Sequence, residues 1–121
     1  GLFYMKETYT VGRENQDHYQ GKVIILINEL TQSQAEFTAM AFRTAPNVTV
    51  IGSTTAGADG DVSLFSLPGG ITTGISGIGI YYPDGTETQR VGIVPDITVT
   101  PTIEGNRDEL LEKAVELIIS N

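Results

Sequence analysis

The sequence has no cysteine, few basic residues and no long hydrophobic run. Without cysteine the chain can form neither a disulfide nor a thiolate metal site. Its cysteine content therefore does not indicate whether the protein works in an oxidising or a reducing compartment. Seven basic residues against 15 acidic ones give a formal net charge of -8. This charge argues against a nucleic-acid or anionic-membrane partner, because both attract clustered Lys and Arg. No apolar segment approaches the ~20 residues that cross a bilayer.

With 121 residues, of which 40% are hydrophobic, the chain is long enough for one domain with a core and too short for two. The amino end has neither a basic patch nor a hydrophobic signal core, and we expect the sequence to be a piece of a longer protein. Residues 1–20 are polar with scattered aromatics, and they predict at most a short strand between Tyr4 and Val11. His18, the only histidine, lies in this polar segment and is expected to be solvated.

The segment from Lys22 to Gly60 predicts a strand, a helix and a second strand. The run Val23–Ile27 is apolar without alternation, which is typical of a strand buried on both faces. Apolar residues then recur at helical spacing, namely Phe37, Met40, Ala41 and Ala45, until Pro46 ends the helix. Val48–Ile51 supplies the second strand. We therefore predict an α/β fold with a right-handed parallel crossover.

In such units ligands gather beyond the carboxyl ends of the strands. We therefore expect the turn 28–33 and the glycine-rich loop 52–60 to lie side by side. The loop lacks the glycine spacing of nucleotide-binding sites and the Gly-Lys-Ser/Thr sequence. Asp59 and Asp61 flank Gly60, but the regular series of acidic calcium ligands is missing, and a turn with solvated acids is expected. No cofactor and no metal are predicted.

Beyond Gly60 the pattern predicts three more strands and a closing helix. The strands are 62–67, 71–82 and 97–99, with a tight turn at 83–86. Asn106 is expected to cap the helix, because Glu109 follows three residues later. The apolar stripe of the helix is predicted to consist of Leu110, Leu111, Ala114, Val115 and Ile118. Its solvated side is expected to carry Arg107, Glu112, Lys113 and Glu116.

Two roles are open for Ser33. The sequence Ser33-Gln34-Ala35-Glu36 fits a capping box, in which serine and glutamate satisfy backbone N–H groups at a helix start. A serine at the amino terminus of a helix, beyond a buried strand, also lies where N–H groups can stabilise an oxyanion. A nucleophilic serine needs a base, and no adjacent His or Lys is visible. The Gly-x-Ser-x-Gly elbow is absent too.

Several motifs carry a resemblance to a known family. They are Gly21-Lys22-Val23-Ile24-Ile25-Leu26-Ile27-Asn28, Thr31-x-Ser33-x-Ala35-Glu36, Val50-Ile51-Gly52-x-Thr54-Thr55-x-Gly57, Tyr81-x-Pro83-Asp84-Gly85 and Gly92-Ile93-Val94-Pro95-Asp96-Ile97. In this order, they resemble the second half of the catalytic domain of the tail-specific, carboxy-terminal-processing serine peptidases. The branch near tricorn protease is more similar than the lysine-dependent processing branch.

The resemblance implies a role for each matching position. Ser33 matches the nucleophile, and the backbone N–H of Gln34 matches an oxyanion donor. The general-base lysine of the processing branch is replaced by Ala58. The relay glutamate of the tricorn-like branch falls on Gln89, with Glu87 as a nearby substitute. The base histidine of that branch would lie before the first residue of this sequence, and His18 does not match it.

The family implies a partial ClpP-like or crotonase-like α/β core, and a bacterial serine endopeptidase exported to the periplasm or outside the cell. Through a Ser33 acyl-enzyme it would cleave a peptide or protein substrate, and alone it would be inactive. Other expected partners are the missing amino-terminal part of the parent chain and a second copy of this fragment. Ala58 and Gln89 keep a second function open, a catalytically inactive member that binds peptides or other ligands. In a third, Ser33 only caps its helix.

Overall fold

The computed structural model describes residues 10–100 and 107–120 and confirms an α/β fold. The elements are β1 (Val23–Ile27), α1 (Gln34–Arg43), β2 (Val48–Gly52), β3 (Asp61–Leu67), β4 (Ile71–Ile78), β5 (Ile97–Thr98) and α2 (Glu109–Ile119). The strand predicted between Tyr4 and Val11 lies almost wholly outside the described residues. In the part of the chain that the structure describes, no helix is both long enough and apolar enough to cross a membrane.

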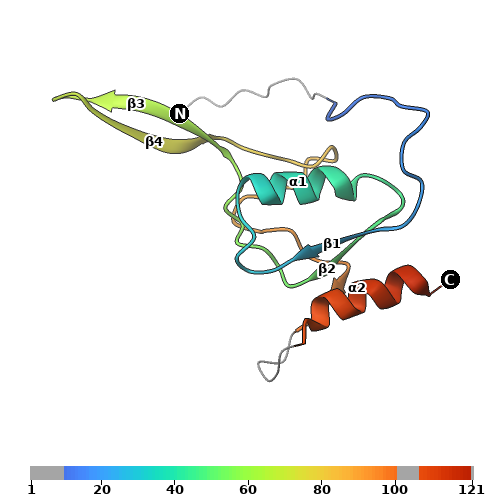
Figure 1. Cartoon of the computed structure of the whole chain (residues 1–121). Coiled ribbons are helices and arrows are strands. Elements are labelled where there is room, and N and C mark those ends of the chain that lie inside the picture. Colours follow the sequence, from blue (N-terminus) through green and yellow to red (C-terminus); the bar gives the residue numbers. More distant parts are fainter. Residues whose placement is uncertain (1–9, 101–106, 121) are drawn as a thin grey trace.

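A three-stranded parallel sheet in the order β1-β2-β5 forms the centre of the fold. Val23 pairs with Val48, and the register continues to Ile27 and Gly52. The connection between these strands is α1, so the predicted parallel strand–helix–strand unit is confirmed. Figure 1 shows the sheet between the two helices, with α1 on one side and α2 on the other. This arrangement brings the turn after β1 and the loop after β2 to the same end of the sheet.

The prediction that Val23–Ile27 is buried on both faces is wrong for most of the strand. Within residues 10–100 and 107–120, β1 pairs only with β2, and its other edge has no strand partner. Only Ile27 is buried, and Leu26 is 39% exposed. An uninterrupted apolar run indicates which surfaces avoid water, but it does not show which segment covers them. The central strand of the described sheet is β2.

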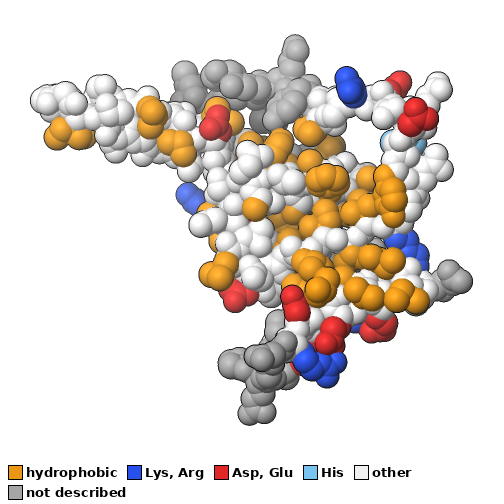
Figure 2. Space-filling view, in the orientation of Figure 1, with side chains coloured by type: hydrophobic (Ala, Val, Ile, Leu, Met, Phe, Trp, Pro, Cys, Tyr) orange, Lys and Arg blue, Asp and Glu red, His pale blue; other side chains and the backbone are white. Residues whose placement is uncertain are grey.

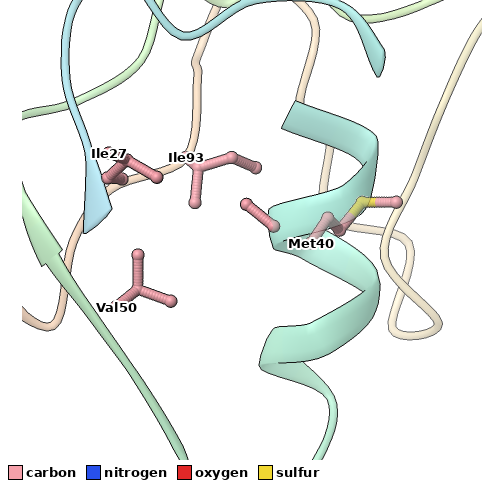
Figure 3. Packing of buried hydrophobic residues seen from close by; sticks show 5 residues of the cluster. Ile27, Met40, Val50 and Ile93 are labelled. Carbon is pink, nitrogen blue, oxygen red and sulfur yellow. The ribbon is translucent and has the colours of Figure 1, made fainter. Parts of the chain in front are cut away.

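Two apolar layers hold the sheet to its helices. Between the sheet and α1, the buried cluster consists of Ile27, Ala39, Met40, Val50 and Ile93. Figure 3 shows Ile27, Val50 and Ile93 gathered beside α1, the helix that carries Met40. Side chains alternate along a strand, so Ile51 lies on the opposite face, where α2 packs with its buried Ala114.

The closing helix differs from its prediction at the cap and along its stripe. The cap is Asp108, whose carboxylate accepts the backbone N–H of Leu111 at 2.9 Å, whereas Asn106 lies outside the described residues. Of the predicted stripe only Ala114 is buried. Exposed apolar side chains on α2 are Leu111, Val115, Ile118 and Ile119. A short sheet offers α2 one narrow contact line, so these four side chains stay exposed.

The antiparallel pair β3–β4 projects away from the rest of the molecule (Figure 1). Every residue of β3 is exposed, so its ladder of backbone hydrogen bonds is its main support. The predicted long strand ends early, at Ile78, and the chain then makes a second, smaller hairpin. There Tyr81 bridges Glu87, and the N–H of Tyr82 donates to the carbonyl of Thr86 at 2.9 Å, which confirms the predicted turn at 83–86.

Candidate active site

The turn 28–33 and the loop 52–60 lie side by side at the carboxyl ends of β1 and β2, as predicted. The backbone N–H of Ala56 donates to the carbonyl of Thr31 at 3.0 Å. The hydroxyl of Ser53 donates to Oε2 of Glu29 at 2.8 Å. Gly52 opens the loop with a φ of 130°, and a Cβ there would lie 1.9 Å from the carbonyl oxygen of Ile27. Only glycine allows the start of the loop to approach the end of β1 this closely.

Ser33 immediately precedes α1 in a strained backbone conformation. Its φ is 53° and its ψ is -123°, and its side chain is exposed. In the described part of the chain, only Ser33 and Arg90 are non-glycine residues with positive φ. Such strain clusters at functional sites, and a serine on a sharp strand-to-helix turn presents its hydroxyl to solvent. This strained turn was not predictable, because the segment lacks the glycines of the common elbow.

Ser33 and Glu36 lie in the capping-box arrangement that their spacing predicted. The backbone N–H of Ser33 donates to Oε2 of Glu36 at 3.0 Å. The backbone N–H of Glu36 also faces the serine side chain, but this second contact of the box is too loose to count as a hydrogen bond. The glutamate, more than the serine hydroxyl, therefore fixes the start of the helix.

Glu36 joins the start of α1 to the neighbouring loop. Its side chain is fully buried. Oε1 accepts the hydroxyl of Thr55 at 2.5 Å and the N–H of Gly57 at 2.7 Å. Oε2 accepts the N–H of Ala58 at 2.9 Å in addition to that of Ser33. A buried carboxylate is costly unless its lone pairs are satisfied, and four donors meet this requirement. Glu36 thereby sets the position of Ser33 relative to the loop.

A third segment, 88–93, is fixed to the other side of the same loop. The N–H of Ile93 donates to the hydroxyl oxygen of Thr55 at 2.7 Å, and the N–H of Thr55 donates to the carbonyl of Ile93 at 3.3 Å. The N–H of Arg90 donates to the carbonyl of Gly57 at 2.7 Å. Thr55 therefore links the buried carboxylate to the third segment. We name α1's first turn, the loop 53–60 and the segment 88–93 the Glu36 network.

The prediction of two solvated acids beside Gly60 is wrong for Asp59. Its side chain is only 5% exposed, with Oδ1 accepting the N–H of Gly60 at 2.8 Å and Oδ2 lying 3.5 Å from the hydroxyl of Thr88. Burial raises the pKa of Asp59, and the charge of Glu36 adds to the rise. Asp61 is exposed, as predicted. No group of acidic and histidine side chains in the described segments could hold a metal ion.

Three residues that the sequence singled out, Gln34, Ala58 and Gln89, lie at different places in this network. Gln34 is exposed and is the first residue of α1, where backbone N–H groups are not bonded within the helix. The N–H of Ala58 donates to the carboxylate oxygen that also accepts the N–H of Ser33, so the position predicted to match the family's lysine lies beside Ser33 and carries only a methyl group. Gln89 lies over Gly60, where a Cβ would be 2.3 Å from its Nε2.

No hydrogen bond within the described residues joins Ser33 to Gln89, Glu87 or His18. Glu87 is exposed in the small hairpin. His18 is exposed, and its Nδ1 lies 2.8 Å from the carbonyl oxygen of Asn15 in its own loop. The described site therefore presents a serine and a helix amino terminus without a base on the serine. That combination can supply a nucleophile and an oxyanion donor, and it needs proton transfer from elsewhere.

The comparisons with known proteins point to one family. The model of peptidase family S41 matches residues 3–99. A candidate peptidase from Parabacteroides merdae is 28% identical, with a TM-score of 0.77 over 88% of this chain and 35% of that one. Mature CPAF complexed with lactacystin is 26% identical, with a TM-score of 0.60 over 70% of this chain and 17% of that one. No curated protein matches the sequence.

Tricorn protease shows a likeness of fold alone. It is 18% identical, with a TM-score of 0.64 over 93% of this chain and 13% of its own. The chain thus spans about a third or less of the length of these three structures.

Proposed function

The chain belongs to peptidase family S41, and we propose that it carries the nucleophile, Ser33, of a serine peptidase. The Ser33 hydroxyl attacks the carbonyl carbon of a peptide bond while its proton passes to a base. The amine product then leaves with a proton, and an ester joins the acyl group to Ser33. Water attacks this ester and releases the acid product and the free serine. The substrate class is a peptide or protein.

The strained conformation of Ser33 is the observation that carries this proposal. A cap residue has no need of a φ of 53°, since cap residues adopt extended backbone conformations without strain. The buried Glu36 and its four donors hold the strained turn in place. The position of Ser33 is thus determined by the contact of its backbone with Glu36, which leaves its side chain exposed to a substrate.

The oxyanion that forms during attack would be stabilised by the backbone N–H of Gln34. This group opens α1, and the positive end of the helix dipole favours negative charge at the same place. Since residue 34 directly follows the nucleophile, the donor and the reacting oxygen belong to one turn of backbone. A second donor would come from the rest of the protein.

The base also belongs to the rest of the protein in this proposal. Ala58 cannot act as a base, although its backbone lies beside that of Ser33. Gln89, at the family's relay position, has no acidic proton to exchange and lies over Gly60. We therefore propose that the isolated chain does not hydrolyse peptides. We further propose, on the resemblance alone, that the longer protein lies outside the cytoplasm of a bacterium.

The surface of the chain supports a large partner. It exposes 9493 Å², compared with about 6,300 Å² for a compact monomer of 13.0 kDa. A groove of about 730 Å³ runs along the unpaired edge of β1 and the side of α1, and Figure 2 shows apolar side chains across this face and along α2. We propose that the remainder of a longer protein adds a strand to β1. A second copy of the chain would compete for the same edge.

Peptide hydrolysis by the longer protein tests the proposal. We expect Ser33→Ala to abolish hydrolysis and Ser53→Ala to preserve it, since the Ser53 hydroxyl is bonded to Glu29. Urea unfolding of both variants controls for folding. Undiminished hydrolysis by Ser33→Ala would exclude Ser33 as the nucleophile.

Ala58 and Gln89 favour a second candidate, a family member without catalysis that binds peptides in the same cleft. Saturable peptide binding by the longer protein, with no turnover by wild type, would support this candidate.

The substitution Ser33→Thr cannot distinguish a Ser33 that only caps its helix from a Ser33 that is the nucleophile. A β-branched side chain at a φ of 53° is strained in both cases, so this substitution harms the protein whatever the role of Ser33.

A further inference from the structure

Arg90 is held at the surface of the candidate site in a conformation that disfavours arginine. Its φ is 65°, and its side chain is exposed. Thr88 and Gly92, two positions away on either side, are buried. The carbonyl of Thr88 accepts the N–H of Val91 at 3.2 Å and that of Gly92 at 2.8 Å, which makes a tight turn with Arg90 inside it. The turn therefore presents one long cationic side chain to solvent.

Hydrogen bonds connect this turn to Ser33. The N–H of Arg90 donates to the carbonyl of Gly57, and the N–H of Gly57 donates to the carboxylate of Glu36. The same carboxylate accepts the N–H of Ser33. A Cβ on Gly57 would lie 3.0 Å from the carbonyl carbon of Arg90, so the two backbones are in direct contact. The two strained non-glycine residues of the described chain are thus fixed to one loop.

Within residues 10–100 and 107–120, the Arg90 guanidinium has no hydrogen-bond or ion-pair partner. Among the described residues, Arg13 and Arg90 are the basic side chains that make neither an ion pair nor a hydrogen bond. The others have partners: Lys22 donates to the end of α2, Arg43 to Asp96, Arg107 to Glu112 and Lys113 to Glu116. An exposed arginine in a strained turn, where glycine would fit without strain, gains nothing from the fold.

We propose that Arg90 binds a carboxylate of the peptide substrate and so determines specificity at this site. The inference rests on the proposed peptide-binding function. A guanidinium offers a planar pair of N–H donors that matches a carboxylate in two parallel hydrogen bonds. The chain has a net charge of -8, and the Arg90 guanidinium is a positive charge on its surface to which an acidic group can bind at short range. The carboxylate is either that of an acidic side chain or that of the peptide's carboxyl terminus.

Peptide binding measured by fluorescence anisotropy tests this inference with the longer protein. All variants carry Ser33→Ala, so that no turnover intervenes. The probes are fluorescein-labelled decapeptides of Ala, Val and Leu that differ at two places. One internal position is Glu or Gln, and the carboxyl end is a free acid or an amide. The Glu–Gln pair and the acid–amide pair separate the two sources of the carboxylate.

With Arg90 present, we expect the carboxylate form of one pair to bind about tenfold more tightly, as a charge-assisted bidentate contact would provide. Arg90→Gln should abolish this preference, and Arg90→Lys should retain part of it because the charge remains without the fork. Arg13→Gln removes the other unpaired cation and should leave the preference unchanged. Equal behaviour of Arg90→Gln and Arg13→Gln would overturn the proposal, as would the absence of saturable binding for every peptide.

The failure of this inference is separable from that of the peptidase proposal. If Arg90 has no role, Ser33→Ala still abolishes hydrolysis by the longer protein while Arg90→Gln leaves the Glu–Gln and acid–amide ratios of kcat/KM unchanged. If Ser33 is not the nucleophile, hydrolysis survives Ser33→Ala whatever the peptides show.

Discussion

The Glu36 network and the β3–β4 hairpin meet at Gly60, and they differ in burial. On one side of Gly60, Glu36 and Thr88 are fully buried, and Asp59 is nearly so. On the other side every residue of β3 is exposed, including Leu64 at 73%. The network depends on side chains from three segments, whereas the hairpin depends on its own backbone ladder. A substitution in the network should therefore affect the position of Ser33 without affecting the hairpin, and a substitution in the hairpin should leave Ser33 in place.

The largest effect is expected where the network is centred. Glu36→Ala leaves four donors without their acceptor, and we expect it to lower the free energy of unfolding by about 4 kcal/mol. Urea unfolding measures this loss. Glu29→Ala is the matched control, since that carboxylate is exposed and should cost less than about 1 kcal/mol. Similar losses for the two variants would contradict the central place of Glu36.

A matched isoleucine pair compares the core beside the network with the hairpin. Ile93 is fully buried, and Ile75 in β4 is 59% exposed. Ile93→Ala should lower the free energy of unfolding by about 3.5 kcal/mol through lost burial and a cavity. Ile75→Ala should change it by less than about 0.5 kcal/mol. A large loss for Ile75→Ala would mean that the hairpin packs against the body of the protein in solution.

A smaller effect is expected from releasing the strain at Ser33. Glycine adopts positive φ without cost, so Ser33→Gly should be more stable than Ser33→Ala by about 1 kcal/mol. Thermal unfolding of the two variants measures the difference. Greater stability of Ser33→Ala would show that residue 33 has an ordinary helix-cap conformation in solution.

The smallest effect is a pH dependence that should differ in sign between Asp59 and Asp84. Burial raises the pKa of Asp59 above its usual 3.8, so just above pH 3.8 the folded state keeps a proton that the unfolded chain has lost. That stability is present below pH 3.8 and is lost as the pH rises through the folded pKa. Asp59→Asn cannot ionise, so its stability relative to wild type should rise with pH across this window.

Asp84, in the small hairpin at 81–87, is the opposite case. The backbone N–H of Thr86 lowers the pKa of Asp84 below 3.8. Its contribution is present above pH 3.8 and is lost as the pH falls through the folded pKa. The stability of Asp84→Asn relative to wild type should therefore fall as the pH rises toward 3.8. Urea unfolding between pH 2 and 7 would contradict both assignments if the two variants showed the same slope.

The sequence predicted the parallel crossover well, because two short runs rich in β-branched residues, β1 and β2, flank a segment with apolar residues at helical spacing, α1. It also predicted the meeting of the turn 28–33 with the loop 52–60, which follows from the topology of parallel strands. Burial of α2 was not predictable from its apolar residues, since a helical stripe does not reveal how wide a surface it faces. The exposed Leu111 shows this.

At the candidate site, the spacing of Ser33 and Glu36 predicted the two contacts of a capping box but not the network. Gly57 and Ala58 donate to Glu36 from a loop about twenty residues away, and no local rule connects such positions. The burial of Asp59 escaped prediction for a similar reason, because its partner Thr88 comes from a third segment. The strain at Ser33 and Arg90 had no signal either, since neither residue type favours positive φ.

Fluorophosphonate labelling, read by intact mass and peptide mapping, tests the central claim most directly. The longer protein is compared with its Ser33→Ala and Ser53→Ala variants after treatment with the probe. We expect one adduct on the peptide that contains Ser33 in wild type and in Ser53→Ala, and none in Ser33→Ala. Equal labelling of wild type and Ser33→Ala would contradict the assignment of Ser33 as the nucleophile.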